Sequence, residues 1–423
     1  MILIKNGRVV DPASGTDEAL DLLLEDGRIK ALGKFSRSES YEQVIDAAGK
    51  IVAPGLVDIH VHFRDPGLTY KEDIVTGSAA AAAGGFTTVI CMANTKPVVD
   101  SVDTLSDLRR RAEELPVHVL NAAAVTKGLK GEELTDMKAL RAAGAAGFTD
   151  DGIPIASSAL LFEAMKMVQE LDVPISLHEE DPALIASAGV NQGTVSRQLG
   201  VGGAPALAEE SLIARDCALA LRTGAKVDIQ HISSGVSVDI VRSMKRLGGR
   251  IFAEVTPQHF SLTQQAVLER GALAKVNPPL REEADRYALI QGLKDGTIDF
   301  IATDHAPHSR EEKAKELNQA PSGMIGLETA LALGITNLVR KGHLTMLQLL
   351  EKMTVNPARF YNLDCGTLKE GAAADLVIFD ERERWTVTED GFRSKSCNSP
   401  FIGMELYGKV HYTICGGRVV YEA

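Results

Sequence analysis

Two histidines two positions apart, His60 and His62, are the first residues of this sequence with metal-binding chemistry. They close an apolar run, and Arg64 follows at the same spacing. Side chains at alternate positions of a strand point to one side, so all three are expected to share a face. Two imidazoles on one face can hold a single metal ion. Alone, the pair is a modest signal, because many such pairs are structural.

Other ionisable residues follow apolar runs further along the chain: Asp150-Asp151, His178, His231 and Asp304. A single histidine after such a run is more often a hydrogen-bonded core residue than a ligand. Their joint occurrence favours a metal site, because the chain has only ten histidines and four predicted strand ends carry at least one. Four histidines and two aspartates exceed the needs of one zinc ion and suit a bridged pair. Imidazole-rich ligation favours zinc, with manganese, cobalt or iron as alternatives.

Strands and helices alternate through the middle of the chain, over residues 53–364, which predicts eight successive strand–helix units. The predicted strands are Leu56–Phe63, Thr87–Met92, Val117–Ala124, Ala145–Thr149, Pro174–Leu177, Lys226–Ile232, Arg250–Val255 and Asp299–Thr303. Intervening stretches such as Ser157–Leu171 and Pro205–Arg222 have helical periodicity. The fold class is therefore α/β, a closed (β/α)8 barrel of the TIM type. An open doubly wound sheet is the alternative, but no phosphate-binding glycine fingerprint is present. In a barrel the chemistry lies at the carboxyl ends of the strands, where the candidate ligands fall.

The two ends of the chain, residues 1–52 and 365–423, have a different texture. Short alternating apolar runs are separated by turn pairs such as Asn6-Gly7, Asp26-Gly27 and Gly416-Gly417. We expect both ends to form one composite domain, a small β-sandwich beside the barrel.

Composition excludes several classes of protein. The 423 residues are 45% hydrophobic and 24% charged, as in ordinary globular proteins. A formal net charge of −12 argues against nucleic acid and anionic membranes as partners. The five scattered cysteines suit a reducing compartment, and no signal peptide or membrane span is visible. We expect a soluble cytoplasmic protein.

Several longer motifs resemble one known family. The chain resembles the amidohydrolase superfamily and, more narrowly, the bacterial dihydroorotases of class I, essentially over its whole length. The motifs that carry the resemblance are His60-Val61-His62-Phe63-Arg64-Asp65-Pro66-Gly67, Met92-Ala93-Asn94-Thr95, Phe148-Thr149-Asp150-Asp151-Gly152, Val276-Asn277-Pro278-Pro279-Leu280-Arg281, Ala302-Thr303-Asp304-His305-Ala306-Pro307-His308 and the stretch from Gly366 to Leu376.

The resemblance implies a set of roles for the candidate ligands. His60, His62 and Asp304 would hold one zinc, and His178 and His231 the other. Asp151 would bridge or assist both, where many relatives carry a carboxylated lysine; Asp150 is the less favoured choice, and one of the two is expected to form a simple Asx turn. Asp304 would also be the catalytic acid and base.

The same resemblance implies the contacts with a substrate. These residues are His62, Arg64, Asn94, Asn277, His308, Ser322 and Gly323. Arg64 can hold a carboxylate in a bidentate fork, although a salt bridge to Asp58 or Asp65 is its alternative. Asn277 could instead serve only the turn before Pro278.

Three positions depart from the family pattern, at Ala93, Glu179 and Ser322. Ser322 affects the expected shape of the pocket, and Glu179 could perturb the second metal electrostatically. None of the three removes a metal ligand. His259 lies near the end of the seventh predicted strand and is interpreted as structural.

The implied function is the zinc-dependent, reversible cyclisation of N-carbamoyl-L-aspartate to L-dihydroorotate in de novo pyrimidine (UMP) biosynthesis. The alternatives are another cyclic amidohydrolase, of the allantoinase or hydantoinase type, and a non-catalytic dihydroorotase-like partner of aspartate transcarbamoylase. The resemblance implies a homodimer and leaves association with aspartate transcarbamoylase open. The charged segment 309–316 is either a mobile lid or a solvated helix.

Overall fold

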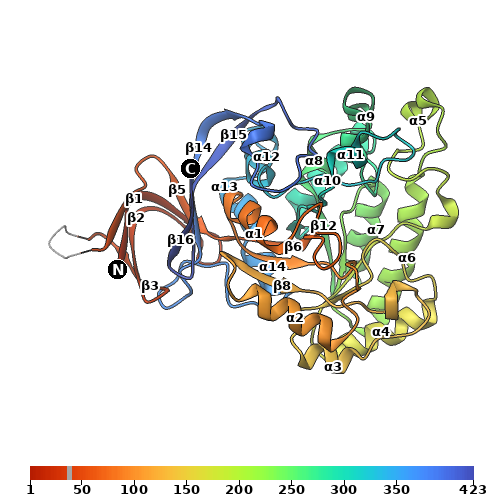
Figure 1. The fold of residues 1–423 in the computed structure, drawn as a ribbon, viewed down its shortest axis with the longest axis horizontal. Helices are drawn as coiled ribbons and strands as arrows, with labels where there is room; N and C mark the ends of the chain where they lie inside the picture. The colour runs from red at the N-terminus through yellow and green to blue at the C-terminus, as the bar shows by residue number, and fades with distance from the viewer. Residues whose placement is uncertain (36–40) are drawn as a thin grey trace.

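A computed structural model describes residues 1–35 and 41–423. Within these residues the strands form three sheets, one from the two chain ends and two from the middle of the chain. Figure 1 shows the terminal sheet on one side and the parallel strands with their surrounding helices on the other.

The parallel strands occupy all eight of the predicted strand segments. Three strands form one sheet in the order β6-β7-β8, and five form another in the order β13-β12-β11-β10-β9. Their bounds are β6 Leu56–Val61, β7 Phe86–Cys91, β8 His118–Asn121, β9 Phe148–Thr149, β10 Ile175–Leu177, β11 Val227–Ile229, β12 Ile251–Val255 and β13 Phe300–Ile301.

Isolated parallel bridges join the two sheets at both edges. Ala123, just after β8, pairs with Phe148 of β9, and Val61 of β6 pairs with His305, just after β13. The amide of Thr149 donates to the Ala123 carbonyl at 2.9 Å, and the amide of His62 donates to the His305 carbonyl at 2.9 Å. These bridges connect the end of β8 with β9, and the end of β6 with the residues that follow β13.

Helices follow the parallel strands along the chain. The predicted helix at 157–171 is α4, where the Ser157 side chain accepts the Leu160 amide at the N-cap and Leu161, Ala164 and Val168 are buried. The helix bounds are α1 Ile74–Ala83, α2 Val102–Ala112, α3 Met137–Ala142, α4 Ser158–Glu170, α5 Thr194–Leu199, α6 Ala206–Thr223, α7 Gly235–Arg246, α8 Pro257–Ser261, α9 Gln265–Arg270, α10 Glu283–Asp295, α11 Arg310–Lys313, α12 Ala330–Gly334, α13 Met346–Met353 and α14 Val355–Phe360. No helix in the described ranges is long and apolar enough to cross a membrane.

The strands of the two chain ends are connected by hydrogen bonds into a single sheet of eight strands. Its order is β16-β15-β14-β5-β1-β2-β3, and β4 also pairs with β1. The join is made by β14, which runs antiparallel to β5 with Val377 opposite Ala53. The bounds are β1 Ile2–Asp11, β2 Thr16–Glu25, β3 Arg28–Gly33, β4 Gln43–Asp46, β5 Ile51–Pro54, β14 Leu376–Thr386, β15 Glu405–Cys415 and β16 Arg418–Glu422.

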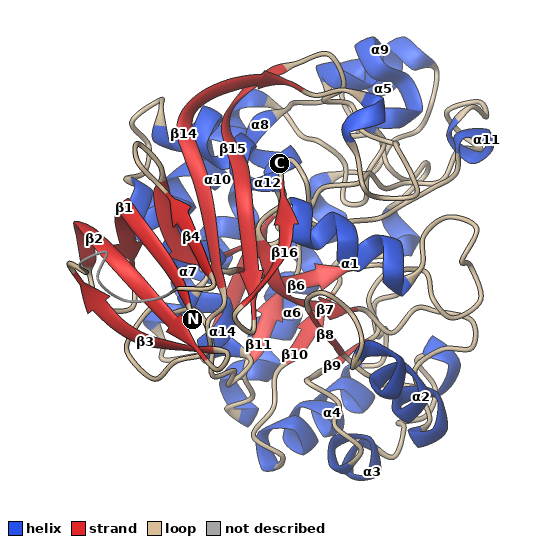
Figure 2. Ribbon diagram, turned by 60° about the vertical axis from the view of Figure 1, so that its left-hand side comes forward, coloured by secondary structure: helices blue, strands red, loops and turns tan. Residues whose placement is uncertain are grey.

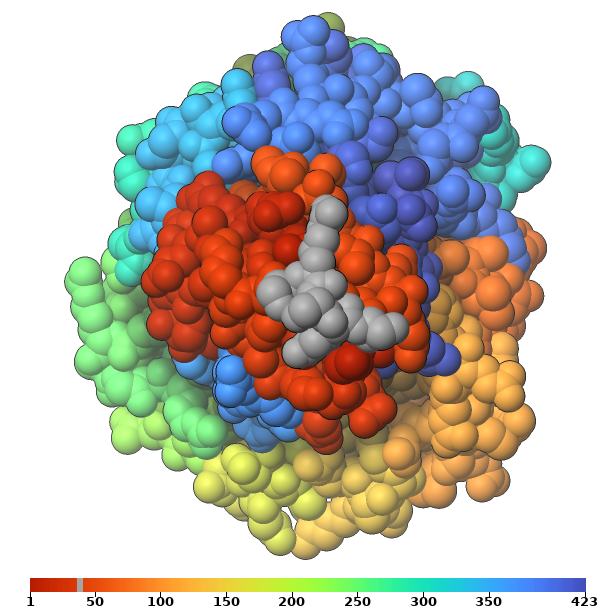
Figure 3. Space-filling view, turned by 90° about the vertical axis from the view of Figure 1, so that its left-hand side faces the viewer, coloured from red at the N-terminus to blue at the C-terminus, as the bar shows by residue number. Residues whose placement is uncertain are grey.

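A continuous apolar core links this terminal sheet to the parallel strands. One cluster of buried residues contains Val89 of β7 together with Val377 and Phe379 of β14. A smaller cluster, including Ile4 and Leu22, lies within the terminal sheet itself. Figure 2 shows the long strands β14 and β15 beside α1 and α12, and Figure 3 looks onto the N-terminal strands from outside.

Candidate active site

The six predicted metal ligands lie at the carboxyl ends of the parallel strands. His60 is in β6 and His62 follows it, whereas the other four come shortly after β9, β10, β11 and β13. All six side chains are buried: His60, His62, Asp151, His178, His231 and Asp304. The strands therefore bring together residues that are far apart in the sequence.

One candidate ligand group consists of His60, His62 and Asp151, whose ligand atoms lie within 4.8 Å of one another. His60 Nε2 is 3.3 Å from Asp151 Oδ1, and His62 Nε2 is 3.4 Å from Asp151 Oδ2. Asp304 borders the same group, with Oδ1 3.0 Å from His62 Nε2 and 3.5 Å from His60 Nε2. Four side chains thus face one small space.

The second candidate group consists of Asp151, His178 and His231, again with ligand atoms within 4.8 Å of one another. His178 Nδ1 is 2.9 Å from His231 Nε2. Asp151 Oδ1 is 3.9 Å from each of these two nitrogens. Asp151 is therefore common to both groups, as a bridging carboxylate must be.

The donor atoms of these groups fit a cation. His60 Nε2 and Asp151 Oδ1 are buried and have no hydrogen-bond partner among the described residues. Burial opposes the charging of both groups, but the carboxylates of Glu254, Asp151 and Asp304 raise the pKa of His60 well above its usual value. Despite its burial, Asp151 has its pKa held well below the usual range by His60, His62 and His178. A bound metal ion would satisfy the unpaired atoms.

Asp150 and Asp151 have separate surroundings. Asp150 Oδ1 accepts the amides of Val125 at 2.8 Å and Thr126 at 3.0 Å, and Oδ2 accepts the Thr126 hydroxyl. Asp150 therefore holds the backbone of the preceding loop, whereas Asp151 faces the histidines.

Two carboxylates that the sequence analysis did not identify support the histidines. Glu254 Oε1, on β12, lies 2.5 Å from His60 Nδ1 and accepts the backbone amide of His231 at 3.0 Å. Glu180 Oε2 lies 3.2 Å from His178 Nε2. A carboxylate on the second ring nitrogen fixes the orientation of a ligating histidine. Glu254 could have been found from its position inside an apolar strand, because a fully buried glutamate needs a partner.

Arg64 is close to the candidate site, although strand alternation does not place it there. The strand ends at Val61, and Arg64 has a left-handed backbone with φ of 58°. Its Nε donates to the Pro307 carbonyl at 3.2 Å, and its Nη2 is 3.5 Å from His308 Nε2.

The two alternative partners of Arg64 are engaged elsewhere. Asp65 pairs with Arg111 at 2.6 Å. Asp58 accepts the backbone amides of His60 at 3.1 Å and Thr303 at 3.2 Å. Neither predicted salt bridge forms.

The two asparagines predicted to contact substrate behave differently. Asn94 lies between ligand candidates, because its Oδ1 is 3.0 Å from His62 Nδ1 and its Nδ2 donates to Asp151 Oδ2 at 3.2 Å. Asn277 Oδ1 is buried and has no hydrogen-bond partner in the described chain. An unpaired acceptor of this kind is available to a ligand.

His308, Ser322 and Gly323 lie together at the edge of the site. His308 Nε2 donates to the Ser322 carbonyl at 2.9 Å. Gly323 has φ of 129°, and a side chain there would bring its Cβ within 2.8 Å of Ala306 Cβ. Only glycine therefore fits this approach of the two segments.

The segment 309–323 is anchored in this structure, with a single short helix, α11. Ser309 caps this helix by accepting the Glu312 amide at 3.3 Å. The buried Lys313 donates to the Pro321 and Gly323 carbonyls, each at 2.9 Å, and Lys71 pairs with Glu312 at 2.9 Å. These contacts hold the segment against the body of the protein.

Two further positions can be assigned. His259 is saturated, with Nδ1 2.7 Å from the Thr256 hydroxyl and Nε2 donating to the Pro278 carbonyl at 2.9 Å, in agreement with a structural role. Burial lowers its pKa to about 4. Burial and the nearby Asp216 raise the pKa of Glu179 well above its usual value, which favours its uncharged form.

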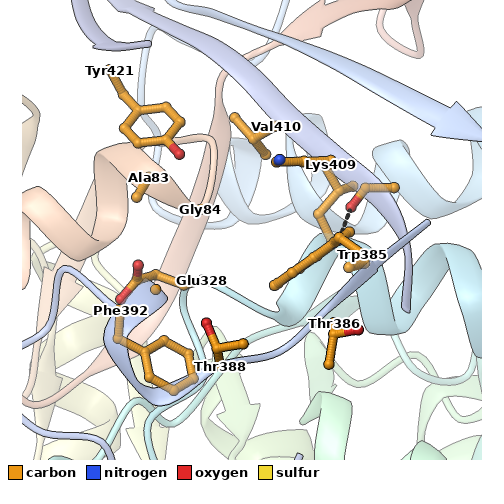
Figure 4. A pocket seen from close by; sticks show the side chains of 14 residues that line it. Ala83, Gly84, Glu328, Trp385, Thr386, Thr388, Phe392, Lys409, Val410 and Tyr421 are labelled. Carbon is orange, nitrogen blue, oxygen red and sulfur yellow. Dashed lines mark hydrogen bonds between the residues drawn. The ribbon is translucent and has the colours of Figure 1, made fainter. Parts of the chain in front are cut away.

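A pocket elsewhere in the molecule is not part of this site. It lies between α1, α12 and the strands β14 and β15, and Glu328, Trp385 and Lys409 line it (Figure 4). Trp385 Nε1 donates to the Gly408 carbonyl at 3.0 Å at its wall. None of the predicted site residues lines it.

Comparison with known proteins places the chain among its relatives. A dihydro-orotase-like family model matches residues 49–237. The chain is 60% identical over 423 residues to the dihydroorotase of Clostridioides difficile (strain 630), with all of both chains covered. It is 55% identical to that of Clostridium acetobutylicum and 53% identical to that of Lactococcus lactis subsp. lactis, covering 100% and 99% of those proteins.

Solved structures agree with this placement. The L-hydantoinase (dihydropyrimidinase) from Arthrobacter aurescens superposes with a TM-score of 0.89 and 28% identity, over 100% of this chain and 96% of that one. The D-hydantoinase from a Bacillus sp. AR9 gives a TM-score of 0.87 at 23% identity, which shows likeness of fold alone. Full-length identity of 60% to a dihydroorotase, together with the six converging side chains, identifies the chain as a member of the dihydroorotase family.

Proposed function

We propose that this protein is a dihydroorotase, which interconverts N-carbamoyl-L-aspartate and L-dihydroorotate in pyrimidine biosynthesis. One observation carries the proposal: two histidine groups share Asp151 at the ends of the parallel strands, and buried ligand atoms there have no hydrogen-bond partner among residues 1–35 and 41–423. The full-length identity to dihydroorotases supports the choice of substrate.

The architecture that we propose for this function is a closed (β/α)8 barrel over residues 53–364, with the ends of the chain as a separate domain. The isolated bridges at Ala123–Phe148 and Val61–His305 support closure. A barrel places every βα loop at one rim, and the candidate ligands lie at or just after the carboxyl ends of their strands.

Two zinc ions are the cofactor that we propose. His60, His62 and Asp304 would hold one, His178 and His231 the other, and Asp151 would contact both. When bound, such ions polarise a substrate carbonyl and lower the pKa of a water molecule. The donor set of imidazole nitrogens and carboxylate oxygens supports zinc.

The chain's own residues supply the proton transfer and the orientation. In hydrolysis, the Asp304 carboxylate takes the proton from the attacking water and delivers it to the leaving ring nitrogen. The Arg64 guanidinium is placed to bind the substrate carboxylate, and Asn94, Asn277, Ser322 and Gly323 orient the ring with His62 and His308. Cyclisation follows the same path in reverse.

The competing functions make different predictions. A hydantoinase or allantoinase substrate has no carboxylate for Arg64, which has no acidic partner among the described residues. A non-catalytic subunit needs no converging ligand set, whereas all six side chains converge here. Both comparisons favour the dihydroorotase.

Metal analysis combined with a substrate comparison tests the proposal. We expect about two zinc ions per chain and turnover of dihydroorotate far above that of hydantoin and allantoin. If the metal-loaded protein prefers hydantoin or allantoin, the proposed substrate is wrong. If the purified protein binds no metal and turns over none of the three compounds, the proposal that it is an enzyme is wrong.

The assembly and the location are also part of the proposal. We propose a homodimer that works in the reducing cytoplasm and is able to associate with aspartate transcarbamoylase. All five cysteines are free, which supports a reducing compartment. Light scattering on the purified protein, alone and with the transcarbamoylase, tests both assemblies.

A further inference from the structure

A third group of metal-binding side chains lies away from the active site. It consists of His118, Asp375 and Cys415, whose ligand atoms lie within 4.8 Å of one another. His118 begins β8, Asp375 precedes β14, and Cys415 ends β15. Because His118 is at the amino end of its strand, this group lies at the opposite end of the parallel strands from His60.

The ligand atoms of His118, Asp375 and Cys415 lie close together. His118 Nε2 is 3.2 Å from Asp375 Oδ2, whereas Asp375 Oδ1 is occupied by the Gly416 amide at 2.7 Å. The carboxylate is therefore held in place by the backbone with one oxygen left for the group. The Asp375 side chain is only 5% exposed but that of His118 is 52% exposed, so solvent reaches the group from one side.

We propose that His118, Asp375 and Cys415 bind a divalent, thiol-seeking metal ion of the zinc class, separate from the catalytic metals. One nitrogen, one oxygen and one sulfur donor make a set that zinc accepts, with a fourth position left open. A thiolate and a carboxylate together balance the two positive charges of the ion.

A metal here would connect the terminal sheet to the parallel strands. Asp375 and Cys415 belong to the terminal sheet, whereas His118 belongs to β8. The site would therefore stabilise the association of the two parts of the molecule and take no part in catalysis.

Cobalt substitution separates this site from the catalytic one. The metal-free enzyme is titrated with Co²⁺ under reducing conditions, and the near-ultraviolet sulfur-to-cobalt charge-transfer absorption is recorded. The catalytic donors are nitrogen and oxygen only, so cobalt there gives no such band. We expect a saturable band in the wild type, its loss in Cys415→Ser, and binding weakened more than about 10-fold in His118→Ala.

Matched controls complete the experiment. Cys397→Ser, which removes a thiol beside Glu389, should keep the full band, and dihydroorotate turnover should be unchanged in all three variants. Absence of a band in the wild type, or a band that persists in both Cys415→Ser and His118→Ala, would overturn the proposal; because His118 is exposed, its variant is expected to fold.

Discussion

Buried polar groups are hydrogen-bonded differently in two regions of the molecule. One region is the rim that carries the candidate metal ligands, and the other is the terminal sheet. In the terminal sheet, Asp21 is buried, but its two oxygens accept the amides of Asn6 at 2.9 Å and Phe35 at 3.2 Å. At the rim, His60 Nε2 and Asp151 Oδ1 are also buried; they lie 3.3 Å apart, and neither has a hydrogen-bond partner in the described chain. An unsatisfied buried group costs about 1–3 kcal/mol, so the rim is built for a ligand and the sheet for stability.

Backbone conformation shows the same contrast. In the terminal sheet, the left-handed residues include Asn6, at a bulge within β1, and Asp26, in the turn between β2 and β3, and both are of types that tolerate this conformation. At the rim, Arg64, His231 and Asp304 are left-handed, with φ of 58°, 36° and 48°. Each costs of order 1–3 kcal/mol, which the packing around the site must offset. Strain at the rim accompanies the positioning of functional side chains.

Removal of the metal should give the largest effect. After chelation, the protein is expected to lose all dihydroorotate turnover, because the side chains of the metal ligands alone have no means to activate water at neutral pH. Thermal unfolding should also begin at a lower temperature, and added zinc should restore both properties. Full turnover in a protein that metal analysis shows to be metal-free would contradict the claim that the rim is built to bind a metal.

Replacement of the proposed acid and base comes next. Asp304→Asn should lower kcat by about 10²–10⁴-fold, the usual contribution of general acid–base catalysis. Metal content, measured in parallel, separates a lost proton carrier from a lost ligand. A variant that retains both its zinc and near-normal turnover would remove Asp304 from the chemistry.

The carboxylate behind His60 should have a smaller effect. Glu254→Gln is expected to weaken zinc binding by about 10–100-fold, because it disturbs the hydrogen bond that orients the imidazole. Competition with a chromophoric chelator measures this affinity. Glu283→Gln, at a surface pair with Arg286, is the matched control and should bind zinc normally; equal affinities in the two variants would show that Glu254 is only structural.

A change in the terminal sheet should affect stability alone. Asp21→Ala removes a buried carboxylate and leaves the amides of Asn6 and Phe35, which make part-buried hydrogen bonds, without these acceptors; it should lower the free energy of unfolding by about 1–3 kcal/mol. Asp17→Ala, on the same strand, breaks a largely exposed pair with Arg8 and should cost at most about 1 kcal/mol. Denaturant unfolding measures both, and turnover of the folded variants should equal that of the wild type. A loss of turnover in Asp21→Ala would show that the two regions are coupled.

Much of the framework could be predicted from the sequence because it depends on local patterns. Alternating apolar runs located all eight parallel strands, and the Ser157 cap located α4. The β-rich character of both chain ends was visible, but their strand order was not, because the pairing of β5 with β14 depends on a contact between distant segments. Supporting groups such as Glu254 were missed because hydrogen bonds to a ligand's second nitrogen leave no fixed spacing in the sequence.

The pairing of β5 with β14 also bears on how the protein is made. During translation, β1 to β5 leave the ribosome first, but the edge of β5 finds its partner only after every strand of the parallel sheets has been synthesised. That edge stays open through most of synthesis and is a place for wrong pairing with other nascent chains. Chaperone capture of nascent chains should therefore persist until β14 emerges.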